Sequence, residues 1–122
     1  MNQSECRIDE YGTKRWVLDG NLHREDGPAI EYTDGEKRWF LNGERHRVDG
    51  PAIEYTDGEK HWFLNGERHR IDGPAVEHIN GSCHWYVNGM KLFPEKDIHN
   101  PVLKADYPGL ICAMVTYLVH EA

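Results

Sequence analysis

Three histidines stand at equal intervals along the chain, and an aspartate follows each of them three residues later. The pairs are His23 with Asp26, His46 with Asp49, and His69 with Asp72. An imidazole beside a carboxylate can act as an acid–base pair or bind a metal ion. A reactive site needs one distinctive arrangement, whereas this pair recurs at every 23rd residue. The repetition therefore favours a structural role, in which imidazole and carboxylate bond to each other or to nearby backbone.

Other reactive patterns are missing from the sequence. No spacing of cysteine and histidine indicates zinc, and there is neither a phosphate-binding loop nor a nucleophile elbow. Cys6, Cys83 and Cys112 are odd in number and irregularly spaced, which argues against a disulfide framework and suits a reducing cytosol. We therefore expect a non-catalytic protein without a metal or other cofactor.

Ten Asx-Gly dipeptides set the spacing of the elements that carry these residues. Their first residues are 19, 26, 34, 42, 49, 57, 65, 72, 80 and 88, so the intervals run 7, 8, 8 and then repeat. Asx-Gly is a strong signal for tight hairpin turns, because both residues tolerate a positive φ. The chain is therefore a 23-residue repeat punctuated by turns.

The period and the turns predict a mainly β fold. We expect a single domain with an open antiparallel β-hairpin repeat solenoid and a C-terminal α-helical cap. Residues 1–15 are expected to form an N-terminal capping strand, and residues 16–91 three repeats with a partial fourth. Residues 92–122 are expected to form a helical segment of the same domain.

Residues 52–64 illustrate the hairpin of one repeat. A two-residue turn at 57–58 pairs Ile53 with Trp62 on one face and places Phe63 on the other. The face with Trp62 is predicted to be the core, and the same rule sends Trp39 and Trp85 inward. The connections at 42–50 and 65–73 could hold a short third strand or a loop. We favour the loop, with two strands per repeat and all repeats running the same way.

The outer face carries the candidate binding residues. Phe40, Phe63 and Tyr86 form a predicted aromatic ladder there, and truncating Phe63 should leave the fold intact. Beside the ladder, the predicted turn pairs Glu31 with Arg38, Glu54 with His61, and Glu77 with His84. Outward aromatic side chains ringed by charge are typical of a protein-binding patch. The alternative is that the rings pack across the strands on alanines or lie beneath the C-terminal helix.

The C-terminal segment is predicted to contain a helix over 110–120, with Asp106 as its N-cap and Pro108 at its start. Residues 93–98 are expected to form one helical turn that Pro101 interrupts. Apolar side chains surround the longer helix, which predicts burial, either as a cap on the last hairpin or in a homodimer. The residues concerned are Leu110, Ile111, Met114, Val115 and Leu118.

The pattern resembles the MORN repeat family, which shares the 23-residue period. The matching residues are Trp39, Asn42 to His46 and Glu54 to Gly58, and the element that begins with tryptophan recurs at Trp16–His23 and Trp62–His69. At His46 to Gly50 the chain is one residue longer and bulkier than the family's pattern. A variant built on the phrase H-R-x-D-G-P-A, common in bacteriophage-encoded proteins, is closer still; that phrase stands at 23–29, 46–52 and 69–75. The resemblance covers roughly residues 12–92 and implies an interaction module of phage origin.

Charge narrows the kind of partner. The formal net charge of −7 argues against direct nucleic-acid binding and against binding to anionic membranes. It suits a basic protein surface, and the phage resemblance implies a stoichiometric inhibitor of a host defence enzyme, such as a CRISPR component that handles nucleic acid. The alternative is a self-assembling structural scaffold. No secretory signal is visible at the start, and the longest apolar stretch, 110–119, is too short for a membrane span, so a cytoplasmic location is expected.

Overall fold

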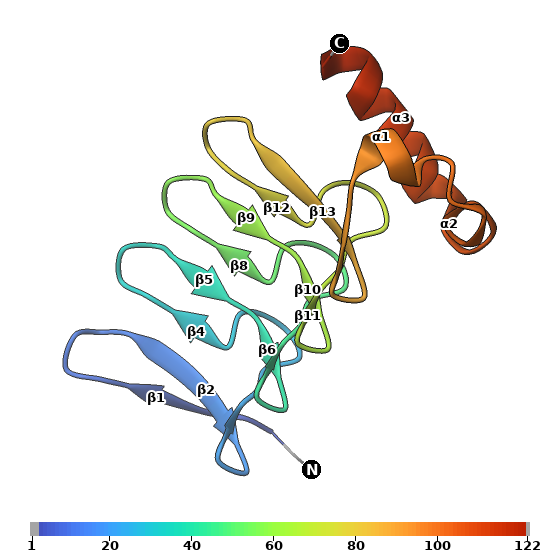
Figure 1. The fold of residues 1–122 in the computed structure, drawn as a ribbon. Helices are drawn as coiled ribbons and strands as arrows, with labels where there is room; N and C mark the ends of the chain where they lie inside the picture. Colours follow the sequence, from blue (N-terminus) through green and yellow to red (C-terminus); the bar gives the residue numbers. More distant parts are fainter. Residues whose placement is uncertain (1–2, 122) are drawn as a thin grey trace.

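The computed structural model describes residues 3–121 and shows a mainly β fold with helices at its C-terminal end (Figure 1). Within these residues the strands are β1 (Glu5–Ile8), β2 (Lys14–Leu18), β3 (Asn21–Leu22), β4 (Ile30–Glu31), β5 (Lys37–Arg38), β6 (Phe40–Leu41), β7 (Glu44–Arg45), β8 (Ile53–Glu54), β9 (Lys60–His61), β10 (Phe63–Leu64), β11 (Glu67–Arg68), β12 (Val76–Glu77), β13 (Cys83–Val87) and β14 (Met90–Leu92). The helices are α1 (Pro94–Asp97), α2 (Pro101–Asp106) and α3 (Pro108–Glu121).

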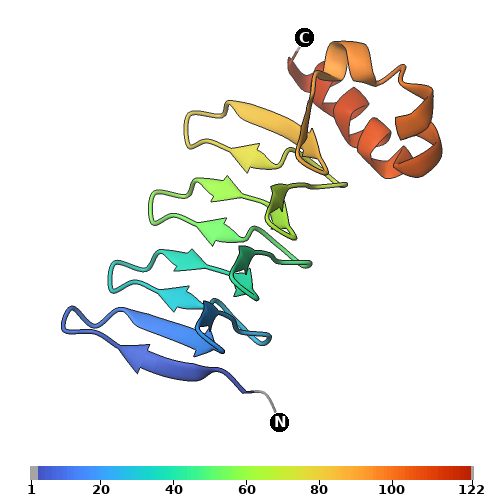
Figure 2. The same ribbon diagram turned by 60° about the horizontal axis from the view of Figure 1, so that its bottom comes forward.

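Antiparallel hairpins stand one behind another and share one sheet (Figure 2). Among the described residues its order is β1-β2-β4-β5-β8-β9-β12-β13-β14, with β3 beside β2. Neighbouring hairpins repeat one register, because Ile53 lies opposite Arg38 of one hairpin and opposite His61 of its own. Most of these strands pair over two residues only, so each hairpin depends on the next for its stability.

The turn of each main hairpin is one residue longer than the sequence predicts. Ile53 pairs with His61, and the Tyr55 N–H donates a hydrogen bond to the Glu59 carbonyl at 3.0 Å. The loop therefore contains residues 56–58, and its glycine has a φ of +100°. A three-residue loop with a left-handed glycine is a common hairpin connection. The predicted two-residue turn is wrong, and a slip of one residue changes which side chains lie opposite each other.

Each repeat also contains a second, smaller hairpin, whose turn is the Asx-Gly dipeptide that comes three residues after the tryptophan. Asn42 and Gly43 have φ values of +51° and +81°, as a two-residue type I′ turn requires, and Leu41 pairs with Glu44 across it. The same turn recurs at 65–66 and joins β10 to β11. The connections therefore contain a short third strand, and the predicted loop is wrong there. The third strand folds back on its own repeat, and the repeats run the same way (Figure 2).

The tryptophans of the inner repeats lie beneath arginine side chains. Trp16, Trp39 and Trp62 are half-buried, whereas the sequence placed Trp39 and Trp62 in the core. In each of these repeats the Cζ atom of an arginine lies 3.8 Å from the centre of the tryptophan ring. The pairs are Arg24 over Trp16, Arg47 over Trp39 and Arg70 over Trp62. We call each pair an arginine lid. Small residues fill the interior between the lids: Ala29, Ile30, Ala52, Ile53, Ala75 and Val76 are buried.

Each lid is held by residues of its own phrase and by a glutamate that follows the phrase. In the middle repeat, Arg47 donates from Nε to Asp49 at 3.0 Å, and from Nη1 to the Pro51 carbonyl at 3.0 Å and to Glu54 at 2.8 Å. A Cβ atom on Gly50 would lie 2.9 Å from the Arg47 Cζ. The phrase H-R-x-D-G-P-A thus contains the lid, its carboxylate and carbonyl acceptors, and a glycine that leaves it space.

The repeated histidines connect one repeat to the next. The Asn65 N–H donates to Nδ1 of His46 at 2.9 Å, and the same bond joins Asn42 to His23 and Asn88 to His69. The predicted bond to backbone is present, but the bond between imidazole and aspartate is not, because each aspartate accepts from the lid arginine. The histidines therefore act as acceptors that fix the spacing of the repeats.

The C-terminal helices pack on the last hairpin (Figure 1). Leu110 and Met114 of α3 are completely buried in one cluster with Trp85 and Val87, as the cap prediction requires. Val115 is 42% exposed, so α3 is not covered all round. Ile111 is partly buried against the Trp85 cluster, and Leu118 is also half-buried.

The helix boundaries differ from the prediction at one place. Pro101 begins α2 rather than interrupting a helix, and the Asn100 side chain caps that helix by accepting from two backbone N–H groups. Asp106 ends α2 and is therefore not the N-cap of α3. A proline at the first helical position suits a helix start, because its missing N–H would have no partner there.

Replacing Gly50 by alanine should destabilise the fold. The new Cβ would collide with the Arg47 lid, and overpacking of this kind costs about 1–3 kcal/mol of unfolding free energy. Urea denaturation of the full chain measures the change. Gly109→Ala is the matched control, because its Cβ would have no neighbour closer than 4.0 Å and lies in a helix. Equal midpoints for the two variants would mean that the lid is not tightly packed.

Candidate functional site

Aromatic rings and basic side chains alternate along the small hairpins. Each hairpin sets one ring opposite one basic residue: Phe40 opposite Arg45, Phe63 opposite Arg68, and Tyr86 opposite Lys91. We call these six residues the aromatic–arginine ladder. The Arg45 Cζ lies 5.4 Å from the Phe63 ring centre, and the Arg68 Cζ lies 5.3 Å from Phe63 and 5.6 Å from Tyr86. These distances permit cation–π attraction, which holds consecutive repeats in register.

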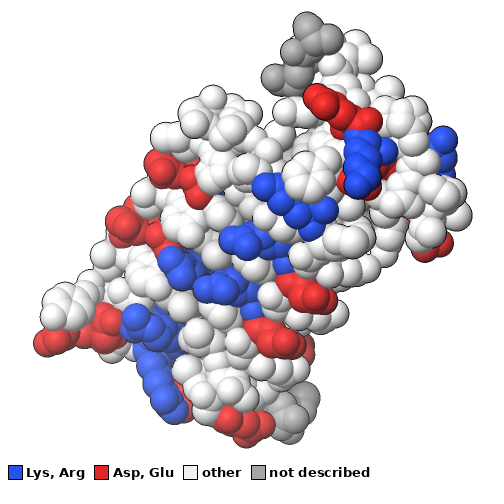
Figure 3. Space-filling model, viewed as in Figure 1, with Lys and Arg blue, Asp and Glu red and all other residues white. Residues whose placement is uncertain are grey.

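The charged ends of the ladder face solvent. Arg45, Arg68 and Lys91 are exposed, and no carboxylate of the described residues lies within 4.0 Å of their charged groups in an ion pair. Figure 3 shows basic side chains in a diagonal band across one face, with acidic side chains on both sides of it. A chain with a net charge of −7 therefore has a locally basic surface.

The structure brings the predicted aromatic residues together, but not all at the surface. Phe63 is 7% exposed and packs in a cluster with Ala52 and Ile53, while Phe40 and Tyr86 are half-buried. The alternative of packing across the strands on alanine thus describes Phe63 well. The expectation that Phe63 can be truncated without loss of stability is not supported by this burial. The ladder's exposed groups are its arginines, which the sequence analysis did not single out.

The predicted acidic residues belong to the lids instead. Glu31, Glu54 and Glu77 each accept a hydrogen bond from a lid arginine, at 2.8 to 2.9 Å. Their predicted partners Arg38, His61 and His84 are also incorrect. The three-residue loops place Lys37, Lys60 and Cys83 opposite them, in the same order.

A second row, of aromatic and imidazole rings with one arginine, runs beside the main-hairpin turns. It consists of Tyr32, Arg38, Tyr55, His61, His78 and His84. The Arg38 Cζ lies 5.6 Å from Tyr32 and 5.9 Å from Tyr55, and the ring centres of His78 and His84 are 5.3 Å apart. The sequence did not reveal this row, because its members differ from repeat to repeat. Their shared position within the period was the available signal.

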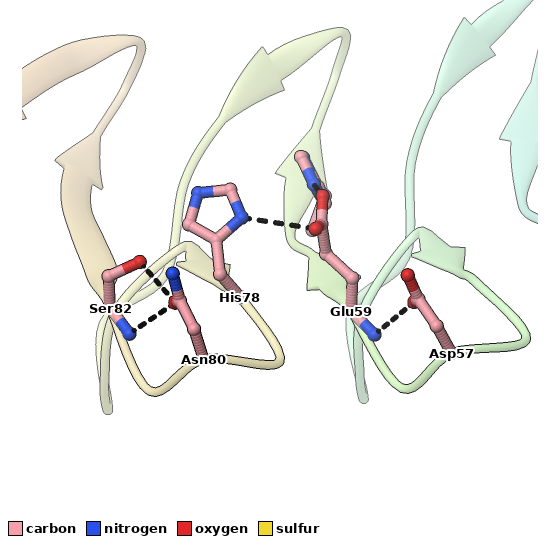
Figure 4. A network of polar contacts seen from close by, with 6 residues as sticks. Asp57, Glu59, His78, Asn80 and Ser82 are labelled. Carbon is pink, nitrogen blue, oxygen red and sulfur yellow. Dashed lines mark hydrogen bonds and ion pairs between the residues drawn. The ribbon is translucent and has the colours of Figure 1, made fainter.

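Glu59 joins two histidines of this row. Its carboxylate lies 2.7 Å from His61 Nε2 and 3.1 Å from His78 Nδ1 (Figure 4). Hydrogen bonds from His61 and then from His78 hold the pKa of Glu59 below its ordinary value. Asp57 in turn accepts from the Glu59 backbone N–H at 2.9 Å, as Figure 4 also shows. The carboxylate is thus fixed by neighbours from two repeats.

Two other histidines are less basic than usual. Burial lowers the pKa of His84, with smaller contributions from the charges of Lys91, His78 and Arg68. Burial also lowers the pKa of His69, against an opposing effect of Glu67. His69 Nδ1 accepts the Asn88 N–H, and a protonated nitrogen could not accept that bond. Both histidines therefore favour the neutral form in the folded chain.

Within residues 3–121, no group of three or more His, Cys, Asp or Glu side chains is arranged to hold a metal ion. Nor does any helix in this range have the length and apolar character needed to cross a bilayer. The His–Glu cluster is a carboxylate shared by the rings of His61 and His78.

Comparisons with protein-family models, with curated proteins and with solved structures gave no match for this chain.

Acidification should weaken the fold in two steps. A histidine has an unfolded pKa of about 6.5, and His69 and His84 have lower values when folded. As the pH falls through about 6.5, these histidines bind more protons in the unfolded chain than in the folded chain. The free energy of unfolding therefore falls as the pH decreases. Glu59 has a lowered pKa, so its contribution is lost only at more acidic pH, as the pH falls through that value. Urea midpoints between about pH 8 and pH 3 measure both steps.

The histidine step has a direct control. Replacing His69 and His84 by glutamine should flatten the dependence near neutral pH, whereas replacing the exposed His99 should leave it unchanged. Midpoints that stay constant between about pH 7.5 and pH 5.5 in the parent chain would contradict this assignment.

Phe63→Ala should destabilise the chain by about 3–5 kcal/mol, because it removes a buried ring at the centre of the ladder. Phe93→Ala, at a ring that is 58% exposed, is the matched control and should change stability by only about 0.5 kcal/mol. Chemical denaturation gives both values. A similar small effect at both positions would show that the Phe63 ring contributes nothing to repeat packing.

Proposed function

We propose that this chain is a non-catalytic repeat module that binds a partner protein through the aromatic–arginine ladder. In this proposal the hairpins form an open, MORN-like solenoid, and its repeats present the same chemical groups at regular intervals. Stoichiometric inhibition of a host defence enzyme is the form of binding that the phage resemblance implies. The proposed location is the cytoplasm.

The observation that carries the proposal is the row of unpaired guanidinium groups. Arg45 and Arg68 are exposed, lie 5.4 and 5.3 Å from the centre of the Phe63 ring, and have no ion-pair partner among the described residues. Guanidinium groups bind carboxylates with two parallel hydrogen bonds, and arginine beside aromatic residues is enriched in protein interfaces. The aromatic packing orders these side chains before binding, which lowers the entropic cost of association.

The local charge refines the expected partner. The expectation of a basic partner followed from the net charge of the whole chain, whereas the ladder itself is basic (Figure 3). We therefore propose that the ladder binds an acidic segment of the partner. Electrostatic complementarity of this kind speeds association and becomes weaker as salt is added.

A second candidate function, self-association as a scaffold, has one observation in its favour. The edge strand β1 is exposed at each of its four residues, and its outer side has no paired strand among the described residues. Free strand edges can pair with another chain. Sedimentation of the purified protein distinguishes the two candidates, because a scaffold forms large homo-oligomers.

Removing the two arginine charges of the ladder should strongly reduce partner capture. The test compares the tagged parent chain with Arg45→Gln/Arg68→Gln in pull-downs from bacterial lysate, with bound proteins identified by mass spectrometry. Lys37→Gln/Lys60→Gln is the matched control, because it removes the same charge from exposed residues outside the ladder. We expect a partner recovered stoichiometrically by the parent and the control, and at least about tenfold less by the ladder variant. Equal recovery by all three chains would refute the assignment of the ladder.

A further inference from the structure

A groove lies between consecutive H-R-x-D-G-P-A connections, apart from the ladder. Between the second and third phrases it has a volume of about 530 Å³ and is lined by Val48, Pro51, Trp62, Leu64 and Ile71, among others. Val48 is 83% exposed and Ile71 is 51% exposed. Two aliphatic side chains thus stand at a groove with a tryptophan in its wall, and the described structure leaves them uncovered.

The chain itself shows what fits the corresponding surface one repeat later. Trp85 and Val87 occupy the positions of Trp62 and Leu64, 23 residues further along. Both are 3% exposed, because they lie in one buried cluster with Leu110 and Met114 of α3. An amphipathic helix with aliphatic side chains at positions i and i+4 therefore covers this surface in the last repeat.

The connection at 69–72 borders both the uncovered groove and the surface that α3 covers. A Cβ on Gly109, in the first turn of α3, would lie 4.0 Å from the Ile71 carbonyl oxygen. The Tyr107 ring packs edge-on against His69 at 6.2 Å, and its hydroxyl accepts from the Asn88 side chain at 3.2 Å. The connection at 69–72 thus supports a helix on one side and borders the uncovered groove.

One of the substitutions in the last repeat explains why α3 covers this surface there. Phe93 stands where the other repeats have the lid arginine, eight residues after the tryptophan. Trp85 therefore has no arginine lid, and the Tyr117 ring contacts it instead, at 5.6 Å. In the inner repeats the lids remain, and the groove beside them is lined by apolar side chains that include Val48, Trp62 and Ile71. A partner helix can contact these side chains without unfolding the lid.

The edges of the groove are acidic. The lid side chains Arg47 and Arg70 are only 21% and 19% exposed, whereas Asp49 and Asp72 are 86% and 80% exposed. Each guanidinium is turned inward to its ring and its own acceptors, and the carboxylates project into solvent. Basic side chains on the flanks of a bound helix would therefore find complementary charge.

We propose that the groove between the second and third connections binds an amphipathic helix of a partner protein. The helix presents aliphatic side chains at i and i+4 to Val48, Trp62 and Ile71, and lysine or arginine to Asp49 and Asp72. This surface is separate from the ladder, so the proposal does not depend on the function proposed for the ladder. The helix α3 is the chain's own example of the fit, held in place by covalent connection.

The test uses a synthetic peptide of residues 106–121 in which Val115 and Val119 are replaced by lysine. Both positions are exposed in α3, so the peptide keeps the side chains that cover Trp85 and Val87 and gains basic flanks. It is titrated into the full-length chain while amide and indole NMR signals are followed. We expect saturable shifts at Trp62, Val48 and Ile71. A peptide that moves only the signals around Trp85, or none, would overturn the proposal.

Matched variants separate specific docking from nonspecific contact. Val48→Asp places a charge in the groove and should weaken binding about tenfold or more, whereas Val102→Asp, on exposed α2, should not. A peptide that also carries Leu110→Asp and Met114→Asp should lose binding to the parent chain. The ladder variant Arg45→Gln/Arg68→Gln should bind the peptide as the parent does. Equal affinity of the Val48→Asp and parent chains would also overturn the proposal.

Discussion

The arginine lid on each tryptophan is the interaction on which the regular part of this molecule depends. A two-stranded hairpin with two-residue pairings cannot bury a large aromatic ring by itself, and the interior here is built mostly from alanine and β-branched residues. The lid covers one face of the indole at 3.8 Å and donates hydrogen bonds to Asp49 and Pro51 of its own phrase and to Glu54 of the following strand. A polar side chain thus performs the covering role that an apolar layer would have in a thicker protein.

Within one repeat, the phrase H-R-x-D-G-P-A makes many structural contacts and the small hairpin makes few. The phrase H-R-x-D-G-P-A is nearly fully committed to structure, since its histidine, arginine, aspartate, glycine and proline each have a defined contact. In the small hairpin, the turn residues and the aromatic ring are the positions that the fold constrains most. Its arginines Arg45 and Arg68 are exposed, and their Cζ atoms lie 5.3 to 5.6 Å from the ring centres of Phe63 and Tyr86. These guanidinium groups are thus in contact both with the rings and with solvent.

The end of the array shows how the same surface is used when the lid is absent. Phe93 replaces the arginine, Trp85 becomes completely enclosed, and the C-terminal helices supply the cover. Repeat proteins need such a terminal layer, because the last repeat has no neighbour to bury its apolar side. The opposite end has β1 as an exposed edge strand, with charged residues Glu5 and Arg7 along it. Charged side chains on an edge strand disfavour uncontrolled pairing with other chains.

The sequence by itself determined the period, the turns and the β class, because Asx-Gly dipeptides at intervals of 7, 8 and 8 leave few other conformations. It also indicated the cap helix and the aromatic positions of the ladder. It could not decide between a two-residue loop and a three-residue loop at Asp57-Gly58, since the same dipeptide forms both. That choice depends on which strands pair, and one residue of slip determined that Trp62 lies under Arg70 rather than opposite Ile53. Only the tertiary structure brought Arg45 to Phe63 and Arg68 to Tyr86, because these contacts join different repeats.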